Sequence, residues 1–175
     1  QLEHPNILPV YESQSDGLVP YLVMPYIAGG SLAEWIAKNP LVPPRQAAEI
    51  ARQLAEGLAH SHDRGVLHRD VKPGNILLAA HETKVSAGEL PFIPKLTDFG
   101  LAKCIDVNRH ETRTGTIMGT PCYMAPEQTG LDPSLGSVGP ATDIHAVGGT
   151  LLAMLTGSPP YEAPSPVQPS NYSPI

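Results

Sequence analysis

The sequence predicts an α+β fold in which a helical body carries a few short strands. Two long stretches place apolar residues at helical spacing: one begins at Pro43-Pro44 and runs to about Asp63, and the other covers Thr142–Leu155. The strand-like runs, such as Tyr21–Met24 and Ile76–Leu78, are much shorter. We therefore expect helices to form most of the core.

Size and composition indicate one globular domain. The chain has 175 residues, of which 41% are hydrophobic and 16% are charged, so it is long enough to bury a core. A net charge of −6 without a Lys/Arg cluster argues against nucleic-acid binding. The longest apolar run, around Val147–Leu155, is too short to span a bilayer, and 2 cysteines are too few for a disulfide framework. These observations predict a cytoplasmic location with no membrane segment in this chain.

A hairpin and a short helix are expected before the long helix. The runs Asn6–Tyr11 and Tyr21–Met24 flank the turn signal SDG at Ser15–Gly17, which predicts a β-hairpin. Ser31 opens the stretch SLAEWIAKN and is expected to cap a short helix.

The long helix has a clear apolar face and a clear end. Gly65 is suited to the left-handed conformation that terminates a helix. The residues of the apolar stripe are Ala47, Ile50, Ala51, Leu54 and Leu58.

Beyond the long helix, the sequence predicts two strands, an insertion and a final helix. Ile76–Leu78 and Lys95–Thr97 are strand-like, and the stretch between them is long for a hairpin connection, which indicates a surface insertion. The helix over Thr142–Leu155 should end at Thr156-Gly157. Residues 162–175 are rich in Pro and Ser and are expected to form a flexible tail.

Three motifs carry the functional signal. HRDVKPGN lies at residues 68–75, DFG at residues 98–100 and GTPCYMAPE at residues 119–127, and Asp143 opens the last helix. In this order they closely resemble the catalytic lobe of a protein kinase, specifically of the bacterial-type serine/threonine branch of the eukaryotic-like protein kinase family. HRD or DFG alone is a weak signal, but the ordered combination is highly specific.

The resemblance implies a protein-kinase-like fold that is mostly the helical C-lobe, with the last small-lobe strands and the hinge. Residues 1–161 would form this partial kinase domain, through the helix after the APE motif, and residues 162–175 the tail. Neither a glycine-rich loop nor a V-A-I-K lysine precedes the HRD motif. We therefore expect this segment alone to bind ATP weakly and to transfer phosphate barely.

The catalytic residues implied by the resemblance are Asp70, Lys72 and Asn75. Phosphoryl transfer needs positioning and charge neutralisation more than covalent chemistry. Asp70 would receive the proton of the substrate hydroxyl, and Lys72 would lie against the γ-phosphate of ATP. Asn75 and Asp98 would hold Mg²⁺ through oxygen atoms. A lysine at position 72 resembles the serine/threonine branch of the family. The expected partner is therefore a protein substrate with a Ser or Thr hydroxyl.

The activation segment is assigned by resemblance to the stretch that contains ETRTGT. Arg69 would pair with a phosphorylated threonine there, with Thr112 and Thr114 at the positions modified in related bacterial kinases. A merely polar loop explains the threonines equally well. Thr120 is expected to hydrogen-bond Asp70 and Lys72.

Four further residues receive structural roles. His68 is expected to pack beneath Phe99 rather than to act as a ligand or a base. Asp143 would hydrogen-bond the backbone of the HRD loop. Glu127 ordinarily pairs with an arginine much further along, and it is expected to lack that partner here, which would destabilise the fold if its side chain were buried.

The stretch YLVMPYIAGG resembles the hinge against which the adenine base lies. Met24 would close the back of the pocket, Pro25 would contribute its carbonyl, and Ile27 would offer backbone N–H and C=O groups to the purine. Leu77 would form the apolar floor. Ordinary core packing explains these apolar residues as well.

Two other functions compete with a protein kinase activity. The intact Asp70, Asn75 and Asp98 argue against a non-catalytic pseudokinase or scaffold, which has no need of magnesium ligands, whereas the missing small lobe argues for it. A small-molecule phosphotransferase such as an aminoglycoside kinase shares a similar loop, but GTPCYMAPE, which shapes a peptide-binding ledge, argues against it. The resemblance also allows dimerisation of the parent kinase.

Overall fold

A computed structural model describes residues 2–14, 19, 21–81, 89–99, 121–130 and 132–161. The α-helices are α1 (Leu32–Lys38), α2 (Pro44–His62) and α4 (Pro140–Thr156). The strands are β1 (Glu12–Gln14), β2 (Tyr21–Val23), β3 (Ile76–Ala79) and β4 (Ile93–Leu96). Short 3₁₀ helices are η1 (Pro73–Asn75), η2 (Pro121–Tyr123), η3 (Pro126–Thr129) and η4 (Pro133–Leu135).

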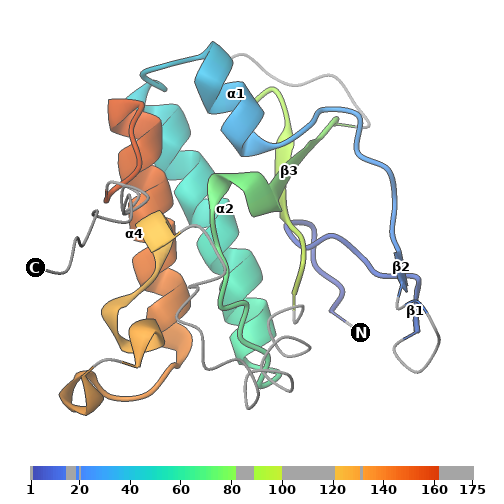
Figure 1. Cartoon of the computed structure of the whole chain (residues 1–175). Helices are drawn as coiled ribbons and strands as arrows, with labels where there is room; N and C mark the ends of the chain where they lie inside the picture. Colours follow the sequence, from blue (N-terminus) through green and yellow to red (C-terminus); the bar gives the residue numbers. More distant parts are fainter. Residues whose placement is uncertain are drawn as a thin grey trace, which may run out of the picture.

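Helices α2 and α4 form the centre of the molecule. They lie side by side and run in opposite directions (Figure 1). The stripe predicted on the long helix faces inward, because Ile50, Leu54 and Leu58 are fully buried. From α4, Val147 and Met154 join the same core. The α+β class predicted from the sequence is confirmed, with helices supplying most of the buried apolar side chains.

Local signals set the helix ends. Pro44 occupies the first turn of α2, where its missing N–H leaves no broken hydrogen bond. Gly65 follows α2 with φ +70°, and Gly157 follows α4 with φ +73°. Both glycines adopt the left-handed conformation, which the sequence predicted for Gly65, and Gly157 lies where the sequence predicted the last helix to end.

The predicted hairpin exists, but its first strand is not Asn6–Tyr11. Strand β1, at Glu12–Gln14, pairs antiparallel with β2. The earlier run instead lies along β4: the N–H of Leu8 donates to the Leu96 carbonyl at 2.8 Å, and the Leu96 N–H donates to the Asn6 carbonyl at 2.8 Å. Burial of Ile7 and Leu8 against the core explains why this segment leaves the hairpin.

The second sheet consists of β3 and β4. These strands pair antiparallel, with Ile76 opposite Leu96 and Ala79 opposite Ile93. Strand β4 begins and ends slightly before the predicted Lys95–Thr97. Residues 82–88, which belong to the predicted insertion, lie outside the described part of the chain.

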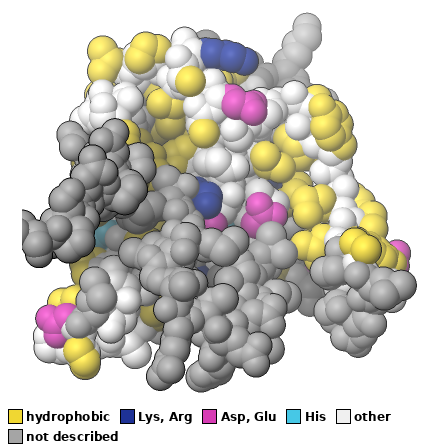
Figure 2. All heavy atoms as spheres, in the orientation of Figure 1, with side chains coloured by type: hydrophobic (Ala, Val, Ile, Leu, Met, Phe, Trp, Pro, Cys, Tyr) yellow, Lys and Arg dark blue, Asp and Glu magenta, His cyan; other side chains and the backbone are white. Residues whose placement is uncertain are grey.

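The surface shown in Figure 2 is mostly apolar and uncharged along the edge that carries the β1–β2 hairpin. Tyr11, Tyr21 and Val23 of this region are exposed. Near the centre of the same face, Lys/Arg and Asp/Glu side chains lie together. Among the described residues, no helix has both the length and the apolar character needed to span a bilayer.

Candidate active site

The HRD loop joins the end of α2 to β3, and it brings three of the predicted residues together. Lys72 Nζ lies 2.8 Å from Asp70 Oδ2. The Asn75 side-chain N–H donates to Asp70 Oδ2 at 2.9 Å and to the Asp70 carbonyl at 2.9 Å. Pro73 opens η1, and its fixed φ restricts the backbone between Lys72 and Asn75.

The environment of Asp70 suits a carboxylate that meets a substrate. Its side chain is 43% exposed, whereas that of Lys72 is 21% exposed and Asn75 is buried. The carboxylate therefore has solvent access on one side and two nitrogen donors on the other. Such a group is held in one orientation and stays available to an incoming hydroxyl.

Asp98 follows β4 and lies next in sequence to a residue that contacts the loop. The Thr97 N–H donates to the Asn75 carbonyl at 3.0 Å, which joins the two segments. Asp98 itself adopts φ +66°, a conformation uncommon for residues other than glycine but tolerated by Asp. Its side chain is half-buried.

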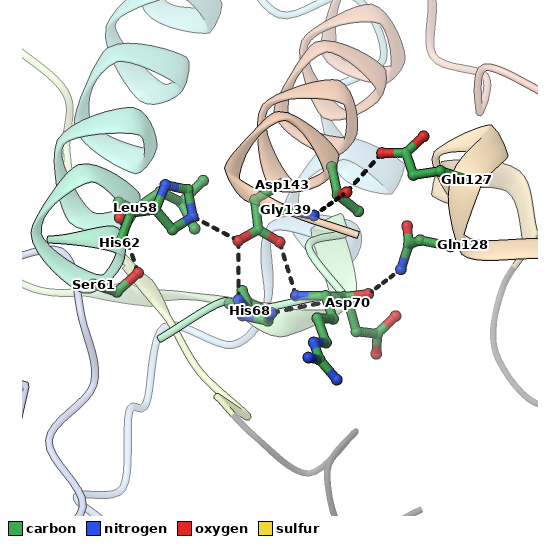
Figure 3. Close-up of polar contacts among 11 residues, drawn as sticks. Leu58, Ser61, His62, His68, Asp70, Glu127, Gln128, Gly139 and Asp143 are labelled. Carbon is green, nitrogen blue, oxygen red and sulfur yellow. Dashed lines mark hydrogen bonds and ion pairs between the residues drawn. The ribbon is translucent and has the colours of Figure 1, made fainter. Parts of the chain in front are cut away.

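Asp143 anchors the HRD loop from α4, as the sequence predicted. Its carboxylate accepts the His68 N–H at 2.9 Å and the Arg69 N–H at 2.8 Å (Figure 3). A third contact, unpredicted, joins its Oδ2 to His62 Nε2 at 2.7 Å. Because Asp143 is only 1% exposed, these partners replace the water that its charge would otherwise require.

His68 packs against Phe99, as predicted. The ring centroids lie 4.5 Å apart, and His68 is fully buried. Burial lowers the pKa of His68, with the nearby Asp143 acting in the opposite direction. The Asp70 N–H donates to His68 Nδ1 at 3.3 Å, which fits a neutral ring.

Glu127, expected to lack its usual arginine partner, has a hydroxyl partner in the structure. Its carboxylate accepts a hydrogen bond from the Thr142 hydroxyl at 2.6 Å, and this bond lowers the pKa of Glu127. Thr142 Oγ1 also accepts the Gly139 N–H at 3.0 Å. The bond between Glu127 and Thr142 joins the APE motif to the start of α4.

Gln128 is a site residue that the sequence did not reveal. Its side-chain N–H donates to the Arg69 carbonyl at 2.7 Å, and its Oε1 accepts the Ala125 N–H at 2.9 Å. Its position directly after the APE motif was the only available signal, and that position says nothing about a contact with residue 69.

The hinge residues lie against β3. Gly29 approaches so closely that a Cβ there would lie 2.0 Å from the Leu78 carbonyl oxygen. The Leu78 N–H donates to the Gly30 carbonyl at 3.0 Å. The residues predicted to form the adenine site are half-buried here, namely Met24, Pro25, Ile27 and Leu77. Met24 Sδ lies 3.8 Å from the Thr97 hydroxyl, so the Met24 side chain contacts the residue directly before Asp98.

Several predicted features fall outside the described residues. They are the activation-segment threonines Thr112 and Thr114, Thr120 with its predicted bonds, and the tail at residues 162–175.

Comparison with known proteins agrees with this architecture. Residues 1–172 match the family model for the protein kinase domain. The chain is 36% identical over 170 residues to the serine/threonine-protein kinase PknB of Mycobacterium leprae, a match that covers 95% of this chain and 25% of that protein. It is 39% identical over 161 residues to PkaA of Streptomyces coelicolor, covering 92% and 27%. For PrkC of Bacillus subtilis the identity is 34% over 166 residues, covering 95% and 23%.

The fold and the site thus define a protein of the kinase class. The chain belongs to the protein kinase family, and the relatives named above are serine/threonine kinases. It spans about a quarter of the length of these relatives. The resemblance stated from the motifs is therefore confirmed.

Proposed function

We propose that the chain is the catalytic lobe of a serine/threonine protein kinase that transfers the γ-phosphate of ATP to a protein hydroxyl. The observation that carries this proposal is the arrangement around Asp70, whose carboxylate lies 2.8 Å from Lys72 Nζ and 2.9 Å from Asn75 Nδ2. Serine/threonine kinases among the relatives support the choice of substrate class.

In the proposed reaction, Asp70 orients the substrate hydroxyl and accepts its proton. The hydroxyl oxygen forms a bond to the γ-phosphorus, and the bond from that phosphorus to the bridging oxygen breaks, which releases ADP. Lys72 offsets negative charge on the transferred group. Its present ion pair with Asp70 keeps both side chains on the same side of the loop.

The donor set fits a magnesium ion. The amide nitrogen of Asn75 is engaged by Asp70, so the side-chain oxygen is the atom left for a cation. Asp98 adds a half-buried carboxylate. Neutral and charged oxygens of this kind suit Mg²⁺, which supplies positive charge to the phosphate oxygens of a nucleotide when bound. ATP and Mg²⁺ are therefore the proposed cofactors.

The remaining assignments follow from the same proposal. Residues 1–161 act as the partial kinase domain, and residues 162–175 as a tail. Met24, Pro25, Ile27 and Leu77 line the adenine site, and Arg69 receives a phosphate on Thr112 or Thr114, with Thr120 supporting Asp70 and Lys72. The parent kinase works in the cytoplasm on protein substrates, does not bind nucleic acid, and is free to dimerise.

The experiment combines thermal unfolding with phosphate transfer. ATP with Mg²⁺ should raise the melting temperature of the chain more than ATP alone, because only the folded state binds the complex. Asp98→Asn should abolish the extra shift from Mg²⁺. Asp70→Asn should keep the shift and remove the weak transfer of radiolabelled phosphate, to a Ser/Thr-containing protein such as casein, that we expect of this segment alone.

Asp63→Asn, an exposed substitution at the end of α2, is the matched control and should behave like wild type. A chain with no magnesium-dependent shift would contradict the kinase proposal and favour a scaffold. A shift that survives Asp98→Asn would contradict the proposed metal site.

A further inference from the structure

The residue before the proposed base is held in an unfavourable backbone conformation. Arg69 has φ +67°, in the left-handed region that non-glycine residues seldom adopt. Such conformations persist when the surroundings determine them, and they cluster at functional sites. The peptide between Arg69 and Asp70 sets the direction in which the Asp70 side chain leaves the backbone. Whatever fixes this peptide therefore also fixes the proposed base.

Two elements hold this residue from opposite sides. On the amide side, Asp143 of α4 accepts the Arg69 N–H at 2.8 Å. On the carbonyl side, Gln128 of η3 donates to the Arg69 carbonyl at 2.7 Å. Figure 3 shows Gln128 reaching toward the loop from the η3 segment, while Asp143 approaches from α4.

Gln128 is itself fixed by its second bond. Its Oε1 accepts the N–H of Ala125, a fully buried residue directly before η3. The Gln128 side chain thus accepts a hydrogen bond from the GTPCYMAPE segment and donates one to the HRD loop. Gln128 is also half-buried and lines a small hollow together with Asp70 and Tyr123.

The hollow places this contact beside the proposed reaction. Asp70, Tyr123 and Met124 line its walls, so the segment that ends in η3 and the proposed base lie around the same hollow. A displacement of η3 would move the donor of Gln128 away from the Arg69 carbonyl. The left-handed Arg69 would then lose one of the contacts that offset its conformational strain.

We propose that Gln128 is a positioning residue for phosphate transfer: its side-chain amide fixes the peptide that joins Arg69 to Asp70, and so couples the GTPCYMAPE segment to the proposed base. This inference rests on the proposed kinase function. The coupling acts through the backbone, because Gln128 bonds the carbonyl and leaves the carboxylate of Asp70 to Lys72 and Asn75.

The decisive variant is Gln128→Glu. A carboxylate keeps the size and the acceptor oxygen for the Ala125 N–H, but it has no hydrogen to donate to the Arg69 carbonyl. The Asp70 N–H belongs to the same peptide as that carbonyl, and it donates to His68 Nδ1. Hydrogen exchange of the Asp70 amide, followed by NMR on the whole chain, therefore reports the orientation of the peptide directly.

In Gln128→Glu, the Asp70 amide should exchange about tenfold faster than in wild type, as expected for loss of one hydrogen bond. The Ala125 amide should keep its wild-type rate. In Gln128→Met, which removes donor and acceptor together, both amides should exchange faster. Gln46→Glu in the first turn of α2 makes the same chemical change away from the site, and it should leave both rates unchanged.

Phosphate transfer gives the second measurement. If the chain transfers phosphate, Gln128→Glu should lower kcat about tenfold and leave the KM for ATP unchanged, because the hinge is not altered. An unchanged Asp70 exchange rate would overturn the proposal. Equal acceleration at buried core amides such as Leu54 and Leu58 would also overturn it, since that result indicates global destabilisation. A chain without turnover would match the weak transfer expected of this segment alone. A chain without the magnesium-dependent thermal shift would refute the kinase function alone, because the exchange measurement still decides the role of Gln128.

Discussion

Asp143 shows how one buried carboxylate organises the residues around it. It accepts hydrogen bonds from two consecutive backbone N–H groups of the HRD loop, and it also contacts His62 at the end of α2. The loop is thereby attached to both long helices. A neutral side chain of the same size has one acceptor oxygen instead of two, so at least one donor would lose its partner.

We expect Asp143→Asn to destabilise the chain by about 2–4 kcal/mol, because charge-assisted bonds are lost and a buried donor is left unsatisfied. Urea unfolding followed by circular dichroism measures this difference. Asp132→Asn changes an exposed aspartate in the same way and should alter stability much less, because asparagine also caps a helix well. Equal effects of the two substitutions would show that the Asp143 contacts contribute little.

Site residues that lie close together in the sequence were predictable, whereas contacts between distant residues were not. Asp70, Lys72 and Asn75 belong to one short loop, so the motif that identifies them also places them near one another. The partners of Glu127 and Gln128 lie 15 and 59 residues away in the sequence. Contacts of this kind depend on how α4 and η3 pack, which no local pattern encodes.

At the scale of elements, the short helix α1 connects the hinge to the core. Its capping box joins the Ser31 side chain to the Glu34 N–H at 3.3 Å and the Glu34 carboxylate to the Ser31 N–H at 3.4 Å. The adjacent hinge residues Gly29 and Gly30 contact β3. Stability of the first turn of α1 thus affects the surface on which we place the adenine.

Ser31→Ala should remove this cap and destabilise the chain by about 1 kcal/mol. Ser31→Thr keeps a hydroxyl at the same position and should recover most of the loss. Chemical unfolding of the three proteins gives the comparison. A threonine variant as unstable as the alanine variant would show that the hydroxyl does not provide the stabilisation.

Elements with strong local signals were predicted with nearly correct bounds. Helix α2 has a regular apolar stripe, an opening proline and a terminal glycine, and all three act within a few residues. The strand expected at Asn6–Tyr11 was wrong because its apolar residues are buried by β4, which is distant in sequence. An apolar run reports that a segment is buried, but it does not report which strand lies beside it.

At the scale of the whole molecule, the HRD loop lies where three parts of the fold meet. Helix α2 leads into it, β3 leads out of it, and α4 anchors it through Asp143. His68 is fully buried at this junction, with Phe99 against one side of its ring. Protonation of this single imidazole therefore affects the stability of the entire arrangement.

Burial lowers the pKa of His68 below its ordinary value of 6.5, and burial together with the nearby His60 lowers that of His4. Since a lowered pKa means that the folded state binds a proton less readily than the unfolded state, stability is complete above about pH 6.5 and is lost as pH falls below it. Asp143 and Asp70 act on His68 in the opposite direction, and they reduce the effect without reversing it.

We expect the free energy of unfolding to fall between pH 7 and pH 5.5, with a slope of up to about 1.4 kcal/mol per pH unit for one additional proton. His68→Asn should remove most of this slope, because asparagine offers an oxygen to the Asp70 N–H and does not titrate. His4→Asn should remove less, since His4 is only partly buried and solvent screens its charge. Chemical unfolding at several pH values measures all three slopes. An unchanged slope in His68→Asn would mean that groups elsewhere in the chain take up the proton, and that the junction beneath the HRD loop tolerates a charged imidazole.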